Sequence, residues 1–296
     1  MDDAMTPETA NQVLDNACRA VGLDANGAEL IRIGSNAVYR LRKPVIVRIA
    51  QAPNSFENAR KQVEVAQWLE SAPYPATRAV DVAQPVETDE RVVTFWVSVS
   101  EKEEYAPISD VAELIRRLHQ LPMPASLALP RMEPFEKVGA SLSELGGISR
   151  EDSQFLSDRS VKLRHSYARL RFELPMGPIH GDANVGNVIV DRQGQPVLID
   201  LDSFCVGPRE WDLIQTALFY DRFGWHTADE YRTFVAIYGY DVMTWDGYEV
   251  LADLRELMMT LWLARQAGVD DRASAEVHKR VVAMETGGSR HDWAPF

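Results

Sequence analysis

Cysteine is scarce in this chain. Cys18 and Cys205 are the only two cysteines in 296 residues, and they do not form a CxxC pair. A single pair cannot build a disulfide framework, and the closely spaced Cys and His residues of a structural zinc site are missing. The cysteine content therefore fits a protein of the reducing cytoplasm.

Long apolar runs are missing as well. No segment approaches the roughly eighteen consecutive apolar residues that a membrane-spanning helix needs. The N-terminal segment, residues 1–15, is acidic and lacks the basic start and apolar centre of a secretory signal. We therefore expect a cytoplasmic protein with no membrane partner.

Basic residues are too few to balance the acidic ones. The 31 Lys and Arg residues stand against 44 Asp and Glu residues, which gives a formal net charge of −13. This balance argues against a nucleic-acid partner and mildly favours a cationic one. Internal repeats and low-complexity segments are also missing, so a repeat architecture is not expected. The sequence leaves the oligomeric state open.

The first hundred residues alternate between helix and strand patterns. Thr6 and Pro7 are typical of a helix start, and the helix is expected to reach about Gly22. Asn54 and Glu57 have the spacing of a capping box for a second helix. Three short strands and a hairpin with its turn at 88–90 are also predicted. The strands are expected at residues 28–34, 37–41 and 45–50, and the hairpin at residues 82–100. We place a lobe boundary at residue 100.

The rest of the chain has mostly helical spacing, with one exception. Helices are predicted at residues 110–120, 150–172 and 245–267. A small β-hairpin is predicted at residues 187–200, where two apolar segments flank a turn containing glycine. This hairpin ends at Asp200.

Polar side chains are concentrated in residues 179–204. Asp182, Asn187, Asp200 and Asp202 lie within about two dozen residues, and two of them follow an apolar run. Carboxylates next to buried strands lose hydration, which is tolerated when a metal ion, an arginine or a phosphorylated ligand compensates the charge. The segment therefore indicates a functional site.

These residues resemble a known family, the aminoglycoside phosphotransferases and choline kinases. The HGDxxxxN element is present at His180, Gly181, Asp182 and Asn187, and an apolar segment ending in aspartate follows at Asp200. The resemblance implies an α+β, two-lobed, protein-kinase-like fold. Residues 1–100 are expected to form the small β-rich nucleotide-binding lobe. Residues 101–296 are expected to form the larger helical lobe with the catalytic loop and the substrate site.

The resemblance assigns catalytic and metal-binding roles. It implies that Asp182 is the catalytic residue, which accepts the hydrogen bond of the substrate hydroxyl and later its proton. It implies that Asn187 and Asp200 bind Mg²⁺, a hard cation that prefers oxygen ligands and bridges nucleotide phosphates. Protein groups contribute to such a transfer mainly by positioning and electrostatics.

The resemblance also implies a nucleotide site in the first lobe. Arg48 would contact the phosphates while paired to Glu64, although the family more often has lysine at the position of Arg48. Ser35 and Asn36 would offer polar groups in the phosphate loop. Adenine would lie against the segment 97–100, which includes Ser98. A forked guanidinium binds phosphate differently from a lysine ammonium, so Arg48 is a departure from the pattern.

Three further polar residues have expected roles. His180 is interpreted as structural, and Asp212 resembles the aspartate that braces the catalytic loop in this family. For Asp202 three alternatives remain open: a second metal contact, a salt-bridge partner, or a solvated carboxylate.

The predicted function is transfer of the γ-phosphate of ATP or GTP to a hydroxyl of a small molecule, such as an aminoglycoside or another antibiotic. The alternatives are a metabolic kinase of a sugar, amino alcohol or amino acid, and a non-catalytic nucleotide-binding protein. A dehalogenase-type phosphatase fits less well, because Phe204 stands where that motif has Thr or Val. A cluster of carboxylates in the second lobe could attract a cationic substrate, or could simply be a solvated face. Its members are Asp221, Asp229, Glu230, Asp253 and Glu256.

Overall fold

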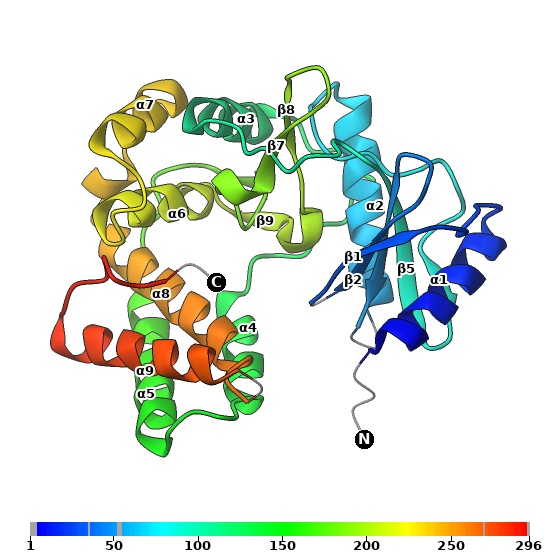
Figure 1. Ribbon diagram of the computed structural model, residues 1–296. Coiled ribbons are helices and arrows are strands. Elements are labelled where there is room, and N and C mark those ends of the chain that lie inside the picture. The colour runs from blue at the N-terminus through cyan, green and yellow to red at the C-terminus, as the bar shows by residue number, and fades with distance from the viewer. Residues whose placement is uncertain (1–4, 35, 52–54, 269, 295–296) are drawn as a thin grey trace. The chain divides into compact units, whose positions relative to one another are not determined.

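The structure of the protein, a computed structural model, describes residues 5–34, 36–51, 55–268 and 270–294. The chain forms two compact units (Figure 1). The N-terminal unit contains Met1–Leu129 and Val185–Phe204, and the helical unit contains Pro130–Asn184 and Cys205–Phe296. The division differs from the predicted boundary at residue 100, because a later segment of the chain packs with the first part.

The N-terminal unit is built on an antiparallel sheet with the strand order β1-β2-β3-β5-β4. The three short strands and the hairpin predicted from the sequence are confirmed, with ends that differ by a few residues. The strands are β1 (Glu29–Ile33), β2 (Asn36–Arg40), β3 (Val45–Ala50), β4 (Val86–Thr88) and β5 (Arg91–Val97).

A tight turn joins β4 to β5. Asp89 and Glu90 have positive φ angles of 49° and 59°, and Thr88 pairs with Arg91. Two successive residues with positive φ are typical of a type I′ turn, whose twist matches that of the flanking strands. The predicted turn position, residues 88–90, is therefore confirmed.

The two faces of the sheet have different surroundings. On β3, Val45, Val47 and Ile49 are buried in a core that includes side chains of α1 (Pro7–Ala20), whereas Ile46 and Arg48 alternate with them. Because side chains alternate along a strand, this pattern leaves Arg48 on the face opposite α1. The apolar pattern of β3 thus determines on which side of the sheet its cation lies.

Two helices complete the N-terminal unit. The helix α2 (Phe56–Ser71) begins with Ser55 as its N-cap, and the predicted capping residue Asn54 lies outside the described residues. The helix α3 (Ile108–Gln120) matches the helix predicted at residues 110–120.

The hairpin of β7 (Val188–Val190) and β8 (Pro196–Leu198) is confirmed, but it belongs to the N-terminal unit. The backbone N–H of Thr77 donates to the carbonyl of Leu198 at 2.8 Å, and the N–H of Ala106 donates to the carbonyl of Val188 at 2.9 Å. Backbone hydrogen bonds on both sides of the hairpin thus fix it to segments that precede it by many residues. Local sequence patterns carry no signal for such pairings.

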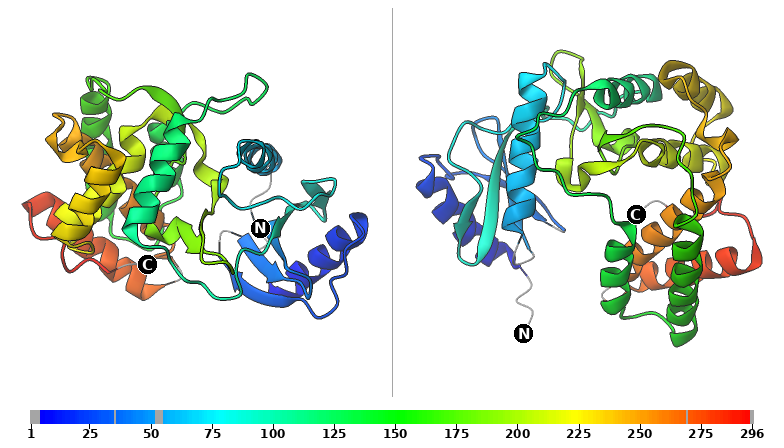
Figure 2. Two further views of the ribbon diagram at one scale, coloured as in Figure 1. Left: turned by 90° about the horizontal axis from the view of Figure 1, so that it is seen from above. Right: turned by 180° about the vertical axis from the view of Figure 1, so that it is seen from behind.

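The helical unit is built around α8 (Tyr248–Ala264) (Figure 2). This helix packs against α4 (Pro134–Ser143), α5 (Arg150–Tyr167), α6 (Glu210–Asp221) and α9 (Asp271–Thr286). The helices predicted at residues 150–172 and 245–267 are confirmed with shorter ends. Every helix in the described part of the chain is too short or too polar to cross a membrane. The unit also contains α7 (Ala228–Tyr238).

One strand pair of the helical unit has no counterpart in the predictions. The strands β6 (Met176–Ile179) and β9 (Cys205–Pro208) pair antiparallel, with Ile179 opposite Cys205. This pair brings the segment before the HGD element next to the segment before α6. It therefore sets the position of the loop that follows β6.

Candidate active site

The loop that carries Asp182 is braced from α6. The backbone N–H groups of His180 and Gly181 donate to the two carboxylate oxygens of Asp212, at 2.7 and 2.8 Å. The indole Nε1 of Trp211 donates to the carbonyl of Gly181 at 3.0 Å. Gly181 has a φ of +82°, which favours glycine at this position. The geometry agrees with the bracing role expected for Asp212 and fixes the backbone immediately before Asp182.

The carboxylate of Asp182 forms an ion pair with Arg255 of α8. The same arginine nitrogen, Nη2, donates to Gln215 of α6, and the guanidinium lies over the ring of Trp211 at 5.5 Å. Arg255 is only 8% exposed, whereas the side chain of Asp182 is 39% exposed. Sequence reasoning did not single out Arg255, which lies between Asp253 and Glu256 in the sequence and so carries no distinctive local signal.

Asn187 and Asp200 lie at the open end of the β7–β8 hairpin. Val188 pairs with Leu198, and the N–H of Ile199 donates to the carbonyl of Asn187 at 2.9 Å. Asn187 is therefore opposite Ile199 and adjacent to Asp200 across the hairpin. Asp200 adopts a left-handed conformation with φ 61°. The hairpin register thus brings together the two predicted metal ligands, whose oxygen donors suit Mg²⁺.

Arg48 forms its ion pair with Asp200, at 3.2 Å between Nη2 and Oδ1. The predicted pairing of Arg48 with Glu64 is wrong for this structure, because Glu64 contacts Arg60 at 3.4 Å within α2. Residues four apart on a helix face each other, so Arg60 is the partner in reach of Glu64. The carboxylate beside Arg48 thus comes from the hairpin and not from α2.

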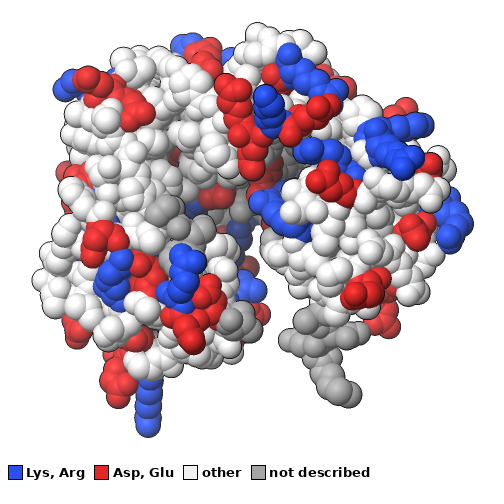
Figure 3. Space-filling model, viewed as in Figure 1, with Lys and Arg blue, Asp and Glu red and all other residues white. Residues whose placement is uncertain are grey.

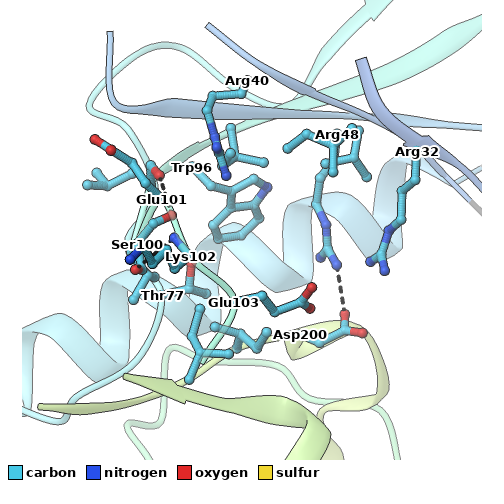
Figure 4. Close-up of a pocket in the computed structure, with 18 of the residues that line it drawn as sticks. Arg32, Arg40, Arg48, Thr77, Trp96, Ser100, Glu101, Lys102, Glu103 and Asp200 are labelled. Atoms are coloured by element: carbon cyan, nitrogen blue, oxygen red, sulfur yellow. Dashed lines mark hydrogen bonds and ion pairs between the residues drawn. The ribbon is translucent and has the colours of Figure 1, made fainter. Parts of the chain in front are cut away.

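A pocket of about 540 Å³ lies in the N-terminal unit (Figure 4). Pairing of the strands builds its wall, because residues directly opposite in antiparallel strands share a face. Arg32 pairs with Val38, which pairs with Arg48, and Arg40 pairs with Ile46, which pairs with Trp96. These six residues and Asp200 all line the pocket.

The two ends of this pocket differ in chemistry. Figure 4 shows Arg32 and Arg48 side by side with their guanidinium groups near Asp200, and Trp96 further along the wall beside Arg40. Clustered guanidinium groups suit phosphate, and an indole ring offers apolar surface. The pocket can therefore hold a phosphorylated ligand with an aromatic base.

Ser98 lines the same pocket and is buried. Its backbone N–H donates to the carbonyl of Pro44 at 2.8 Å, and its hydroxyl donates to the carbonyl of Ser100 at 3.3 Å. Both donors of Ser98 thus hold the segment 97–100 in place beside β3. The contact of this segment with a base stays a prediction.

The turn between β1 and β2 is the place of the predicted phosphate loop. The N–H of Gly34 donates to the carbonyl of Asn36 at 3.0 Å, and Asn36, at the start of β2, pairs with Ala50, at the end of β3. Ser35, the other residue predicted in this loop, lies outside the described residues.

Asp202 accepts hydrogen bonds from three side chains of α2. Its carboxylate accepts hydrogen bonds from the side-chain amides of Asn58 at 2.5 Å and Gln62 at 2.7 Å, and its carbonyl accepts one from Lys61 at 2.6 Å. Both amides bind the same oxygen, Oδ1, and no arginine or lysine side chain of the described residues forms a salt bridge with this exposed carboxylate, so the metal contact stays a prediction. Asp202 connects the end of the hairpin segment to α2, the helix that follows β3.

Comparison with known proteins places the chain in a family. Residues 29–254, more than half of the chain, match the phosphotransferase enzyme family. The chain belongs to this family. No curated protein matches the sequence.

Several solved structures share the α+β kinase-like fold of this phosphotransferase. An amicoumacin kinase, in complex with AMP-PNP, Ca²⁺ and Ami, has a TM-score of 0.74 at 13% identity, over 96% of this chain and 95% of that one. A spectinomycin phosphotransferase, in complex with ADP and spectinomycin, has a TM-score of 0.64 at 14% identity, over 92% and 94% of the two chains. The choline kinase LicA from Streptococcus pneumoniae has a TM-score of 0.63 at 16% identity, over 92% and 98%.

Two carboxylates of the phosphotransferase that were considered for a cationic substrate form a charge network with arginines. Asp253 contacts Arg159 at 3.1 Å and Arg222 at 2.8 Å. Glu256 is fully buried and contacts Arg222 at 3.0 Å and Arg290 at 3.1 Å. Both carboxylates are therefore compensated within the helical unit.

The other members of the proposed acidic cluster are also bound by neighbouring groups. Asp221 accepts a hydrogen bond from the hydroxyl of Tyr248 at 2.8 Å, and burial together with this carboxylate raises the pKa of Tyr248 above its ordinary value. Asp229 pairs with Arg232, and Glu230 completes the capping box of its own helix. On the face shown in Figure 3, acidic and basic side chains are interspersed. Asp221 and Asp253 line one pocket of the helical unit, but Arg222 and Arg290 line it too, so it is not a purely acidic cleft.

Proposed function

We propose that this phosphotransferase transfers the γ-phosphoryl group of ATP or GTP to a hydroxyl group of a small molecule. The observation that carries the proposal is the half-exposed carboxylate of Asp182 on a loop whose backbone is fixed by Asp212. A positioned carboxylate of this kind can accept the hydrogen bond of the acceptor hydroxyl and take its proton late in the reaction. A protein that only binds nucleotide has no need of such a residue.

The N-terminal unit would bind the nucleotide. Arg32 and Arg48 supply cationic groups for the phosphates, and the wall near Trp96 and Ser98 supplies apolar surface and backbone for the base. Neighbours of the fold solved with AMP-PNP, ADP or GDP support a nucleotide co-substrate without favouring one base.

Asn187 and Asp200 would hold Mg²⁺. Their oxygen donors are adjacent in the β7–β8 hairpin and fit a hard cation. The ion, when bound, neutralises charge on the phosphates. Asp200 contributes the stronger electrostatic interaction because it is charged, and Arg48 keeps its carboxylate oriented.

The acceptor is proposed as a small hydroxylated compound, either an antibiotic, in which case the protein confers resistance, or a metabolite. The structural neighbours named above include kinases of both antibiotics and choline. A cytoplasmic location supplies the nucleotide and is part of the proposal.

A nucleotide-consumption screen tests the proposal. Purified protein is incubated with Mg²⁺, ATP or GTP, and a panel of aminoglycosides, other hydroxylated antibiotics and small metabolites. Acceptor-dependent nucleotide consumption is expected with at least one compound, and it should fall by roughly 10² to 10⁴ in the Asp182→Asn variant while nucleotide binding persists. Unchanged consumption by this variant would show that Asp182 has another role.

A further inference from the structure

Arg255 places a buried positive charge directly on the proposed base. Both of its bonds described above come from Nη2, one to the carboxylate of Asp182 and one to the amide oxygen of Gln215. Its Nε is buried and has no hydrogen-bond partner among the described residues. A buried arginine needs compensation, and here a single carboxylate supplies it. The surroundings of Asp182 are therefore not those of an acidic subsite.

The carboxylates of α8 are paired with arginines from other elements. Three carboxylates, Glu249, Asp253 and Glu256, contact three arginines at distances of 2.5 to 3.1 Å. The arginines are Arg159, Arg222 and Arg290. Pairing at these distances offsets the charge of these three carboxylates and so weakens their ability to concentrate cations.

The proposed reaction changes the charge balance at Arg255. The acceptor O–H bond breaks, its proton moves to Asp182, a bond forms between the acceptor oxygen and the γ-phosphorus, and the bond from that phosphorus to the nucleoside diphosphate breaks. Asp182 is then neutral and Arg255 loses the charge of its carboxylate partner, while the acceptor oxygen now carries the negative charge of the transferred phosphoryl group. Gln215 is an amide and cannot replace that charge. An anion on the acceptor would stabilise Arg255 at this stage, whereas an ammonium group would repel it.

We propose that the acceptor carries an anionic oxygen group, a carboxylate or a phosphate ester, close to its reacting hydroxyl, and that Arg255 selects this group. The inference rests on the proposed function and names its substrate class. It distinguishes this chain from an enzyme for amino sugars or amino alcohols, whose acceptors bear positive charge near the hydroxyl.

A pool experiment tests the charge of the acceptor. Small molecules from a cell extract are separated by ion exchange into anionic, neutral and cationic pools, the anionic pool is divided into carboxylates and phosphate esters, and each pool is incubated with the protein, Mg²⁺ and γ-labelled ATP or GTP. We expect label to enter the anionic pool at least about tenfold above the others.

The outcomes of this experiment separate the two proposals. Preferred labelling of the cationic or the neutral pool overturns the anionic class and leaves phosphoryl transfer standing. Labelling of no pool by protein that binds nucleotide overturns the proposed function, and the inference with it. The two anionic pools show which group supplies the charge.

Variants of Arg255 test its part in selection. Arg255→Gln should raise the KM for the anionic acceptor about tenfold or more and reduce the preference for the anionic over the neutral pool, and Arg255→Lys should restore part of it. Arg265→Gln is the matched control, since Arg265 lies at the end of the same helix, pairs with Glu144 and is half exposed.

A purely structural role of Arg255 predicts a different result. It would lower transfer to all pools by the same factor, so an unchanged preference ratio in Arg255→Gln overturns the selection role. Thermal unfolding and nucleotide affinity are measured beside the kinetics. If the Gln variant does not fold, the ratio in Arg255→Lys decides, and a ratio equal to that of the wild type contradicts the inference.

Discussion

At the scale of single residues, Arg48 shows how one cation serves two parts of a site. It lies on β3 within the pocket of the N-terminal unit, and its guanidinium contacts Asp200 of the β7–β8 hairpin. The planar fork of arginine can bind a carboxylate and a phosphate oxygen in one orientation, which a lysine cannot reproduce. The departure from the family's usual lysine is thus compatible with a phosphate-binding role.

Replacing Arg48 tests this role. We expect Arg48→Met to weaken nucleotide binding and lower turnover by about tenfold or more, because a cation at the phosphates and a partner of Asp200 are both lost. Arg48→Lys should retain part of both. Isothermal calorimetry with nucleotide and Mg²⁺ provides the measurement, and Arg60→Met, on the exposed surface of α2, provides the control. Wild-type nucleotide affinity in Arg48→Met would show that Arg48 has no part in binding the nucleotide.

His226 links protonation to stability. It lies beside the ring of Phe219, 5.7 Å between centroids, and burial lowers the pKa of His226 below its ordinary value despite the nearby carboxylate of Glu230. The unfolded chain therefore binds this proton more readily than the folded one. Its contribution to stability is present above about pH 6.5 and is lost as the pH falls through the lower pKa of the folded state.

The His226→Gln variant removes this contribution. Urea unfolding between about pH 8 and pH 5 should show a smaller decline in the free energy of unfolding for the variant than for the wild type. Identical declines would mean that His226 is not buried enough to matter.

At the scale of secondary-structure elements, α6 determines the geometry of the loop that carries Asp182. Its first turn provides Asp212, which is fully buried and receives two backbone N–H groups of that loop. The pairing of β6 with β9 brings the start of the loop close to α6. The base is thus positioned by an element that follows it by some thirty residues in the sequence.

The Asp212→Asn variant tests this bracing. The amide replaces one acceptor oxygen with a donor, so a buried backbone N–H loses its partner, and we expect a loss of about 1–3 kcal/mol of stability. Turnover should fall strongly while nucleotide affinity stays near the wild-type value, because the residues of the nucleotide pocket all lie in the other unit. Asp229→Asn, an exposed position on α7, is the control. Weakened nucleotide binding in proportion to turnover would contradict a local bracing role.

At the scale of the whole molecule, ion pairs tie the helical unit together. Glu256 of α8 joins Arg222 at the end of α6 to Arg290 in the C-terminal segment, and Asp253 joins Arg222 to Arg159 of α5. The C-terminal segment is also held by Trp293, which is buried and packs against the ring of Phe223. These contacts join helices and a terminal segment that are far apart in the sequence.

Two neighbouring glutamates give a matched test of this network. Glu256→Gln should cost about 3–5 kcal/mol of stability, because it leaves two buried arginines without their common carboxylate. Glu249→Gln should change stability by less than about 1 kcal/mol, since the side chain of Glu249 is 76% exposed while it contacts the same Arg222. Equal losses in chemical denaturation would show that burial does not determine the strength of these pairs.

The sequence by itself determined the elements that depend on local patterns. Short β-rich segments bounded by turn residues predicted the strands of the N-terminal sheet, and Asp89 and Glu90 fit the predicted hairpin turn. The segment around Asp182 and Asp200 was recognisable because its polar residues stand at fixed spacing. Such signals are encoded within a few residues, where backbone preferences and side-chain periodicity act directly.

Only the tertiary structure decided the partners of the charged side chains. Arg48 pairs with Asp200, which is 152 residues away in the sequence, and not with Glu64, which is closer in the sequence. Asp182 pairs with Arg255, which is 73 residues away in the sequence. The hairpin that ends at Asp200 belongs to the N-terminal unit, and two of the carboxylates expected to attract a cationic substrate, Asp253 and Glu256, pair with arginines. Burial makes an unpaired charge costly but does not specify which opposite charge compensates it, so packing of distant elements makes that choice.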